Sequence, residues 1–122
     1  MYTVLRITTD AEHRDALLQL GEQMNQKRAG VFSELRKAGD GFSCEVSSSP
    51  SWETHVEALH AFLQDFAATI AQARQMGAAV TVDVAIEPED RSASGALLVL
   101  AVSPFLLAEM AALGLRWELS VY

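Results

Sequence analysis

The sequence predicts an α+β fold, with a single layer of mostly antiparallel or mixed sheet covered by helices in the order β-α-β-β-α-β-β-α-β. Two kinds of periodicity support this prediction. Short stretches with alternating apolar residues predict strands, and longer stretches with apolar residues three and four apart predict helices. Short connections between consecutive strands favour antiparallel hairpins. The chain has 122 residues and no long linker, so one domain, 1–122, is expected.

The first half of the chain contains three predicted strands and one helix. Residues 2–8 alternate and are rich in β-branched side chains, which predicts a strand. Asp10 is a suitable N-cap for a helix that starts at Ala11 and ends near Gly30. Residues 31–36 and 42–47 are the next two predicted strands, joined by a turn-rich segment.

The clearest predicted element is a long helix from 52 to about 76. Ser51 is its expected N-cap and Gly77 its expected stop. Its apolar residues fall on one stripe at helical spacing, which predicts that this helix supports the sheet: Trp52, Val56, Leu59, Leu63, Phe66 and Ile70.

The last third of the chain is predicted to contain three strands and one helix. Residues 80–86 alternate and predict a strand, and 87–95 are expected to form a polar loop. The stretch 96–102 is apolar throughout, which predicts a central strand or a strand at an interface. Ser103 and Pro104 are typical of a helix start, and Gly114 of a helix end after Leu113. Residues 115–122 alternate and predict the final strand.

Two histidines in the long helix resemble a metal-binding motif but have the wrong spacing. His55 and His60 are five residues apart, and five residues turn an α-helix through about 500°, which leaves the two rings about 140° apart. We therefore expect no metal ion or other cofactor here. His55 is expected at the edge of the core, partly buried, and His60 on the solvated face beside Glu57. His13 falls on an apolar stripe and is expected to be packed.

No pattern typical of an enzyme is present in the sequence. The single cysteine, Cys44, alternates with apolar neighbours and is expected on the inner face of a strand, where a thiol is unreactive. Neither a Gly-x-Ser-x-Gly elbow nor a glycine-rich phosphate loop occurs. The sequence therefore favours a protein that is not an enzyme.

The charge of the chain favours a basic protein partner and disfavours nucleic acid. Its formal net charge is −7, and nucleic-acid affinity depends largely on Lys and Arg. Simple solubility is the plain alternative explanation of this charge. The candidate contact residues are the acidic stretch Glu87, Glu89 and Asp90, with Glu53 and Glu57 as a second patch.

Several features of the sequence favour a cytoplasmic location without membrane contact. The longest mostly apolar run, 95–110, is too short and interrupted to span a bilayer, and residues 1–10 lack the pattern of a secretion signal. One cysteine allows no internal disulfide, which suits a reducing compartment.

The last predicted helix has only one charged residue, Glu109. Its apolar residues lie nearly all round: Leu106, Leu107, Met110, Ala111 and Leu113. Such a helix is either buried on all sides or meets another chain, so a homodimer is a second hypothesis.

The second half of the chain resembles a family of small bacterial domains of unknown function. The resemblance rests on His55 and His60 in an amphipathic helix, on Ser-Pro-Phe-Leu-Leu at 103–107, and on a final strand ending at Tyr122. The chain is also similar in size and acidity to bacterial immunity proteins, such as those that neutralise contact-dependent growth-inhibition toxins, several of which are basic nucleases. This resemblance implies an immunity protein that neutralises a basic toxin domain. The alternatives are a homodimeric cytosolic domain or a small-molecule-binding domain.

Overall fold

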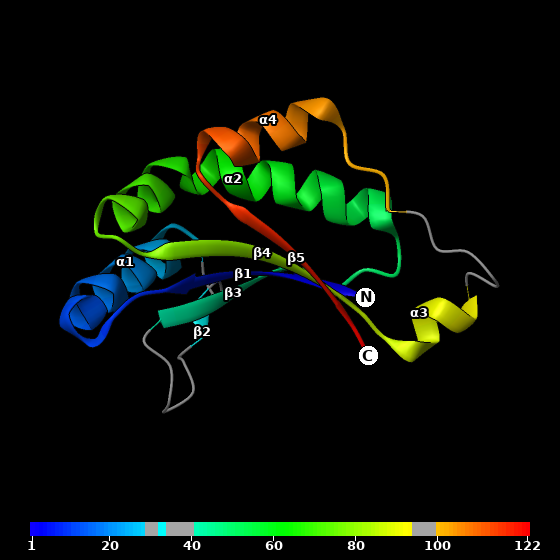
Figure 1. Ribbon diagram of the computed structural model, residues 1–122, viewed down its shortest axis with the longest axis horizontal. Helices are drawn as coiled ribbons and strands as arrows, with labels where there is room; N and C mark the ends of the chain where they lie inside the picture. Colours follow the sequence, from blue (N-terminus) through cyan, green and yellow to red (C-terminus); the bar gives the residue numbers. More distant parts are fainter. Residues whose placement is uncertain (29–31, 34–40, 94–99) are drawn as a thin grey trace.

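The computed structural model describes residues 1–28, 32–33, 41–93 and 100–122, and has the α+β class that the sequence predicts (Figure 1). A mixed sheet carries helices against one face. The strands are β1 (Tyr2–Thr8), β2 (Phe32–Ser33), β3 (Gly41–Ser47), β4 (Ala79–Ile86) and β5 (Arg116–Val121). The helices are α1 (Arg14–Lys27), which follows a short 3-10 turn (Ala11–His13), and α2 (Trp52–Gln75), α3 (Pro88–Ala93) and α4 (Pro104–Ala112).

The sheet has the strand order β2-β3-β1-β4-β5. β1 lies at its centre and pairs antiparallel with both β3 and β4. β4 and β5 are parallel, because the chain between them crosses back over the sheet by way of α3 and α4. β5 therefore forms one edge of the sheet, and it crosses in front of the other strands in Figure 1.

The hydrophobic core lies between the sheet and the helices α1, α2 and α4. Side chains that alternate along the three central strands supply its floor: Leu5, Ile7, Phe42, Cys44, Val80 and Val82. The predicted apolar stripe of α2 supplies most of the core on the helix side. Leu59, Leu63, Phe66 and Ile70 are fully buried, while Trp52 and Val56 lie half-buried at the start of the helix.

Local signals at the helix ends work as the sequence predicts. The side chains of Asp10, Ser51 and Ser103 each accept a hydrogen bond from a backbone N–H three residues later. Gly77 and Gly114 follow α2 and α4 with φ angles of +83° and +67°, the left-handed conformation that favours glycine.

The polar stretch after β4 is not the loop that the sequence predicts, because residues 88–93 form the short helix α3. Its start carries two signals of a helix N-terminus. Pro88 occupies the first helical position, and the Asp90 carboxylate accepts a hydrogen bond from the Glu87 N–H at 2.9 Å. The polar composition of 87–95 predicts a loop, but the stretch contains this helix-capping arrangement.

The predicted strand 96–102 is wrong where the structure describes it. Residues 96–99 lie outside the described residues, and Leu100, Ala101 and Val102 belong to no strand. The Ala101 carbonyl instead accepts a hydrogen bond from the Trp52 indole N–H at 2.7 Å, which ties this segment to the start of α2. Of the predicted strand 31–36, only Phe32–Ser33 is described, as β2.

No helix within the described ranges combines the length and the apolar character that a bilayer crossing requires.

The buried stripe of α2 gives a direct stability prediction. We expect Leu63→Ala to lower the free energy of unfolding by about 2–5 kcal/mol, because Leu63 is fully buried and its truncation leaves a cavity. Chemical denaturation monitored by circular dichroism measures this. Gln64→Ala, at the exposed neighbouring position, is the control and should change stability by less than about 0.5 kcal/mol. Equal effects of the two substitutions would contradict this packing.

Candidate functional site

The face of the sheet opposite α2 carries a buried carboxylate. Asp83 of β4 is fully buried, and it forms an ion pair with Arg6 of β1 and accepts a hydrogen bond from Ser120 Oγ of β5 at 2.8 Å. Glu118 lies 3.9 Å from the same guanidinium. Both carboxylate oxygens of Asp83 are therefore occupied, and the group joins three strands. An occupied carboxylate of this kind suits a structural role better than proton transfer.

His55 is also part of a closed hydrogen-bond network. Its ring is fully buried, with Nδ1 2.8 Å from Thr3 Oγ1 and Nε2 2.5 Å from the carbonyl oxygen of Ser49. A carbonyl only accepts, so Nε2 carries a proton, and in the neutral ring the Thr3 hydroxyl donates to Nδ1. The Trp52 ring stacks on it at a centroid distance of 6.0 Å. The sequence predicted only partial burial, because it does not reveal that Thr3 on β1 meets this helix.

His60 points away from the core, as its spacing from His55 predicts, but its partner differs from the predicted Glu57. Its Nδ1 lies 2.7 Å from Glu109 Oε2, so the pair links α2 to α4. His55 and His60 thus lie on different sides of α2 and do not approach a common ion.

His13 is not packed in the core, which corrects the expectation from its apolar stripe. It is half-exposed, and its Nδ1 lies 2.8 Å from Asp10 Oδ1. This hydrogen bond raises the pKa of His13 and lowers that of Asp10. Potential ligand atoms of Asp10, Glu12 and His13 lie within 4.8 Å of one another, but Asp10 Oδ1 also accepts from the His13 backbone N–H. The proximity of these three residues is explained by the N-cap role of Asp10 at the start of the 3-10 turn.

Cys44 lies on the inner face of β3, as the sequence predicts. Burial raises the pKa of its thiol to about 12. The thiol is therefore protonated near neutral pH, and it lacks the exposure and the electropositive surroundings of a reactive cysteine.

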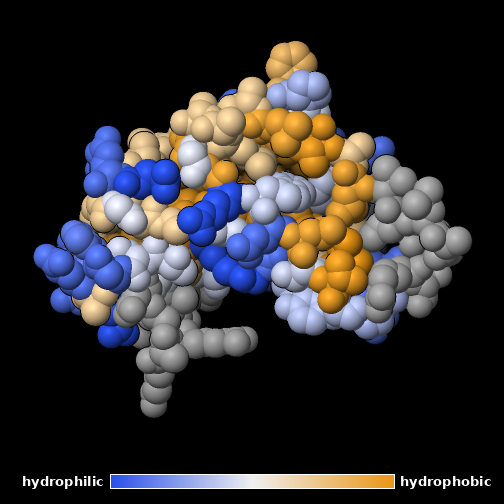
Figure 2. All heavy atoms as spheres, viewed as in Figure 1, coloured by the Kyte–Doolittle hydropathy of each residue, from blue (hydrophilic) through white to orange (hydrophobic). Residues whose placement is uncertain are grey.

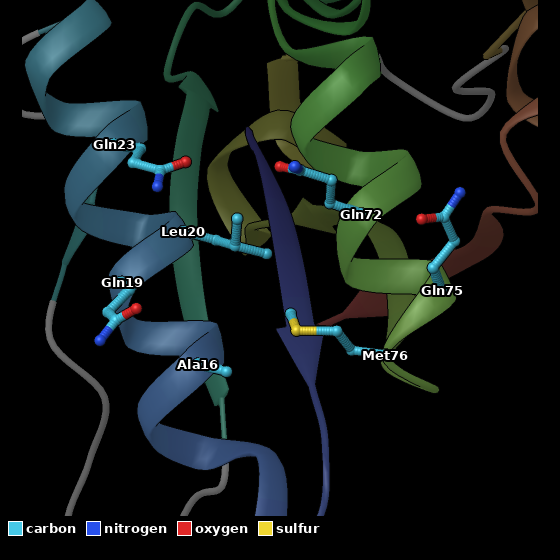
Figure 3. A pocket seen from close by; sticks show the side chains of 7 residues that line it. All are labelled: Ala16, Gln19, Leu20, Gln23, Gln72, Gln75 and Met76. Atoms are coloured by element: carbon cyan, nitrogen blue, oxygen red, sulfur yellow. The ribbon is translucent and has the colours of Figure 1, made fainter.

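A shallow groove of about 330 Å³ lies between α1 and α2 (Figure 3). Gln23 of α1 and Gln72 of α2 direct their amides toward each other across it, while Gln19 and Gln75 point away. Leu20 and Met76 lie between the helices. The lining offers neutral donors and acceptors, without a charged or nucleophilic group.

Exposed apolar side chains gather on α4 and β5. Only Leu106 and Met110 of α4 are buried, so the alternative of a helix buried on all sides is wrong. Among the residues that the structure describes, the exposed large apolar side chains are Phe105, Leu107, Leu119, Val121 and Tyr122. Figure 2 shows hydrophobic atoms extending from α4 toward the C-terminal end of β5. A patch of this kind on a protein surface is typical of an interaction site.

The predicted acidic residues differ in their exposure and in whether their carboxylates are paired within the chain. Glu53, Glu57 and Glu89 are exposed and form no ion pair with another residue that the structure describes. Glu87 is half-buried. Asp90 lies 2.6 Å from the α-amino group of Met1, and this hydrogen bond lowers the pKa of Asp90, with a smaller contribution from the Glu87 N–H. The charge of Asp90 is thus balanced within the chain.

Two of the free carboxylates lie on the face of α2 that carries the contact to α4. The helices α2 and α4 run in the same direction (Figure 1) and meet where His60 contacts Glu109. Glu57 lies one turn before His60 on α2, with Glu53 a further turn before it on the same face. Phe105 lies one turn before Glu109 on α4. We call Glu53, Glu57 and Phe105 the α2–α4 seam. Sequence patterns could not bring the two helices together, since the contact between His60 and Glu109 joins positions 49 apart in the chain.

Comparison with models of protein families, with curated proteins and with solved structures gives no match to this chain. The two resemblances drawn from the sequence therefore stay expectations.

The Asp83 network predicts unequal effects of removing two arginines from the same face of the sheet. We expect Arg6→Leu to cost about 2–3 kcal/mol of unfolding free energy, because it leaves the buried Asp83 carboxylate without its cation; partial exposure of Arg6 keeps the cost below that of a fully buried pair. Arg116→Leu removes an equal charge from an exposed position and should cost less than about 0.5 kcal/mol. Denaturant titration measures both, and similar costs would argue against the network.

The state of Cys44 predicts its reactivity. At pH 8 a thiol with a pKa of about 12 is almost entirely protonated and, here, also buried, so a thiol-specific reagent such as DTNB should not label the native chain. Labelling in denaturant should reach one thiol per chain. Rapid labelling under native conditions would show that the strand opens readily at this position.

Proposed function

We propose that this chain is a non-enzymatic acidic binding protein of the immunity type, which neutralises a basic toxin domain by covering its active site. The α2–α4 seam is the observation that supports this proposal most directly. Phe105 is 88% exposed, and Glu53 and Glu57, on the α2 face that carries His60, are exposed and free of described ion pairs. The partner we propose is a toxin domain such as a contact-dependent inhibition nuclease, which the chain would meet in the cytoplasm.

The composition of the seam matches what fast and tight protein association requires. Carboxylates at the rim of a contact attract a basic surface and raise the association rate. An exposed aromatic side chain at the centre supplies buried apolar area, which mainly slows dissociation. A basic nuclease has a positively charged active-site surface, so an acidic seam with an apolar anchor is complementary to it.

The acidic stretch after β4 is a second, smaller contribution to this surface. Glu89 on α3 is exposed, and Glu87 is half-exposed. Asp90 contributes less to the external field, because the Met1 amine and the Glu87 N–H already satisfy it. We therefore assign the contact first to Glu53 and Glu57 and then to Glu89.

The buried polar groups favour binding over catalysis as the role of this chain. The side chains with catalytic potential in the described core are Asp83, His55 and Cys44. The first two have their polar atoms engaged in hydrogen bonds or an ion pair, and the third is a protonated thiol. None of the three is presented to a ligand.

The seam predicts how charge reversal affects association with the toxin domain. The partner to test is an inactivated basic toxin domain encoded beside this chain, with binding kinetics measured at low and at physiological salt. We expect Glu53→Lys combined with Glu57→Lys to lower the association rate about 10-fold or more at low salt, and less at high salt. Phe105→Ala should instead raise the dissociation rate by about 10-fold or more.

Asp15→Lys combined with Glu22→Lys is the matched control, because it makes the same change of net charge on exposed positions of α1. This control should leave the association rate closer to that of the unchanged chain. Equal effects of the two double substitutions would move the contact away from the seam. Failure of the chain to bind the neighbouring basic domain, or to protect cells that express its active form, would refute the proposed function.

A further inference from the structure

The two edge strands of the sheet are described to different extents. β2 forms one edge, and the structure describes two of the residues there, Phe32 and Ser33. β5 forms the other edge with six residues, and its only described strand neighbour is β4. A long edge strand presents a row of backbone donors and acceptors to any strand of suitable sequence.

The register with β4 determines which residues of β5 face outward. The Tyr122 N–H donates to the Ile86 carbonyl at 3.0 Å, so the backbone groups of even-numbered residues point toward β4. Because backbone direction alternates along a strand, the N–H and C=O groups of Trp117, Leu119 and Val121 point to the free edge.

The side chains of the same three residues lie on the helix-facing side of the sheet. Trp117 is partly covered by the core, but Leu119 and Val121 are 50% and 56% exposed. The end of β5 is thus less covered than its start, and Leu107 is exposed on the flank of α4 that lies away from Glu109. Apolar side chains therefore accompany the backbone groups that point to this edge.

From this geometry we infer that β5 pairs antiparallel with β5 of a second copy of the chain, with the two Leu119 residues opposite each other on a twofold axis. The pairing joins the two sheets edge to edge. In this register Trp117 lies opposite Val121 of the other copy, and Arg116 lies opposite Tyr122. The outward N–H and C=O groups of each odd-numbered residue then meet those of its opposite residue, which forms hydrogen-bonded pairs.

Charge and overlap favour this register over those with the axis at Glu118 or at Trp117. Moving the axis to Glu118 places two carboxylates directly opposite each other, which is destabilising. Moving it to Trp117 brings Gly114 and the end of α4 into the pairing and leaves only the first half of each strand overlapping. With Leu119 on the axis, Glu118 faces Ser120 and the full strand is used. A twofold contact of this kind closes on itself, so the product is a dimer rather than a fibre.

The dimer and the proposed partner contact use different residues. Pairing involves β5, whereas the α2–α4 seam involves Glu53, Glu57 and Phe105. The two proposals can therefore fail independently.

Light scattering at tens of micromolar and disulfide trapping test the dimer together. The trapping variant is Leu119→Cys, because directly opposite residues of an antiparallel pair lie about 5.5 Å apart at Cα, within disulfide range. Leu107→Cys is the matched control, since Leu107 is also 50% exposed. The native Cys44 is buried and does not interfere. We expect a dimer in solution and a cross-linked dimer from Leu119→Cys, with little cross-linking from Leu107→Cys or Glu118→Cys.

A charged substitution on the axis gives a second test. Leu119→Lys places two ammonium groups opposite each other and should raise the dimer dissociation constant at least 10-fold, with the fold retained by circular dichroism. Phe105→Lys adds the same charge outside β5 and should leave the dimer intact. A chain that is monomeric at these concentrations overturns the inference. So does cross-linking that is equal at all three cysteine positions, or a dimer that Phe105→Lys dissolves and Leu119→Lys does not.

Discussion

The packing of α2 against the central strands determines where every other part of the molecule lies. Its stripe of Leu59, Leu63, Phe66 and Ile70 fills the space above β1, β3 and β4. α4 lies beside α2 and is tied to it by the His60–Glu109 pair, and β5 continues from the end of α4. α4 buries only Leu106 and Met110, and the apolar side chains of Leu107, Leu119 and Val121 stay exposed.

Charges in this molecule are divided between internal and external roles. Asp83 and Asp90 have their cations within the chain, Arg6 and the Met1 amine, and these pairs stabilise the sheet and the start of α3. Glu53, Glu57 and Glu89 have no described cation and give the surface its negative field. Net charge alone does not separate these groups, because a buried, paired carboxylate counts the same as a free one but contributes little to the field outside the protein.

The sequence predicts those parts of the fold that depend on local periodicity. The stripe of α2, the alternation of β4 and the caps at Ser51 and Ser103 are each decided within a few residues, and the structure confirms them. The contacts that sequence analysis missed join distant residues: Asp83 meets Arg6 77 positions away, and His60 meets Glu109 49 positions away. The helix α3 was missed for a different reason, since its polar composition resembles a loop and only the Pro88 and Asp90 positions indicate a helix start.

β5 carries charged side chains on one face only, so only that face discourages pairing with an unrelated strand. Arg116, Glu118 and Ser120 lie on the face opposite the helices. Charged side chains on an edge strand discourage unspecific pairing. On the helix-facing side the alternate positions are Trp117, Leu119 and Val121, without a charge. A strand that approaches β5 must therefore match a fixed pattern of charges on one face while it covers apolar side chains on the other. An antiparallel second β5 with Leu119 on the axis satisfies both conditions, because the same alternation is present on both strands and no carboxylate meets another.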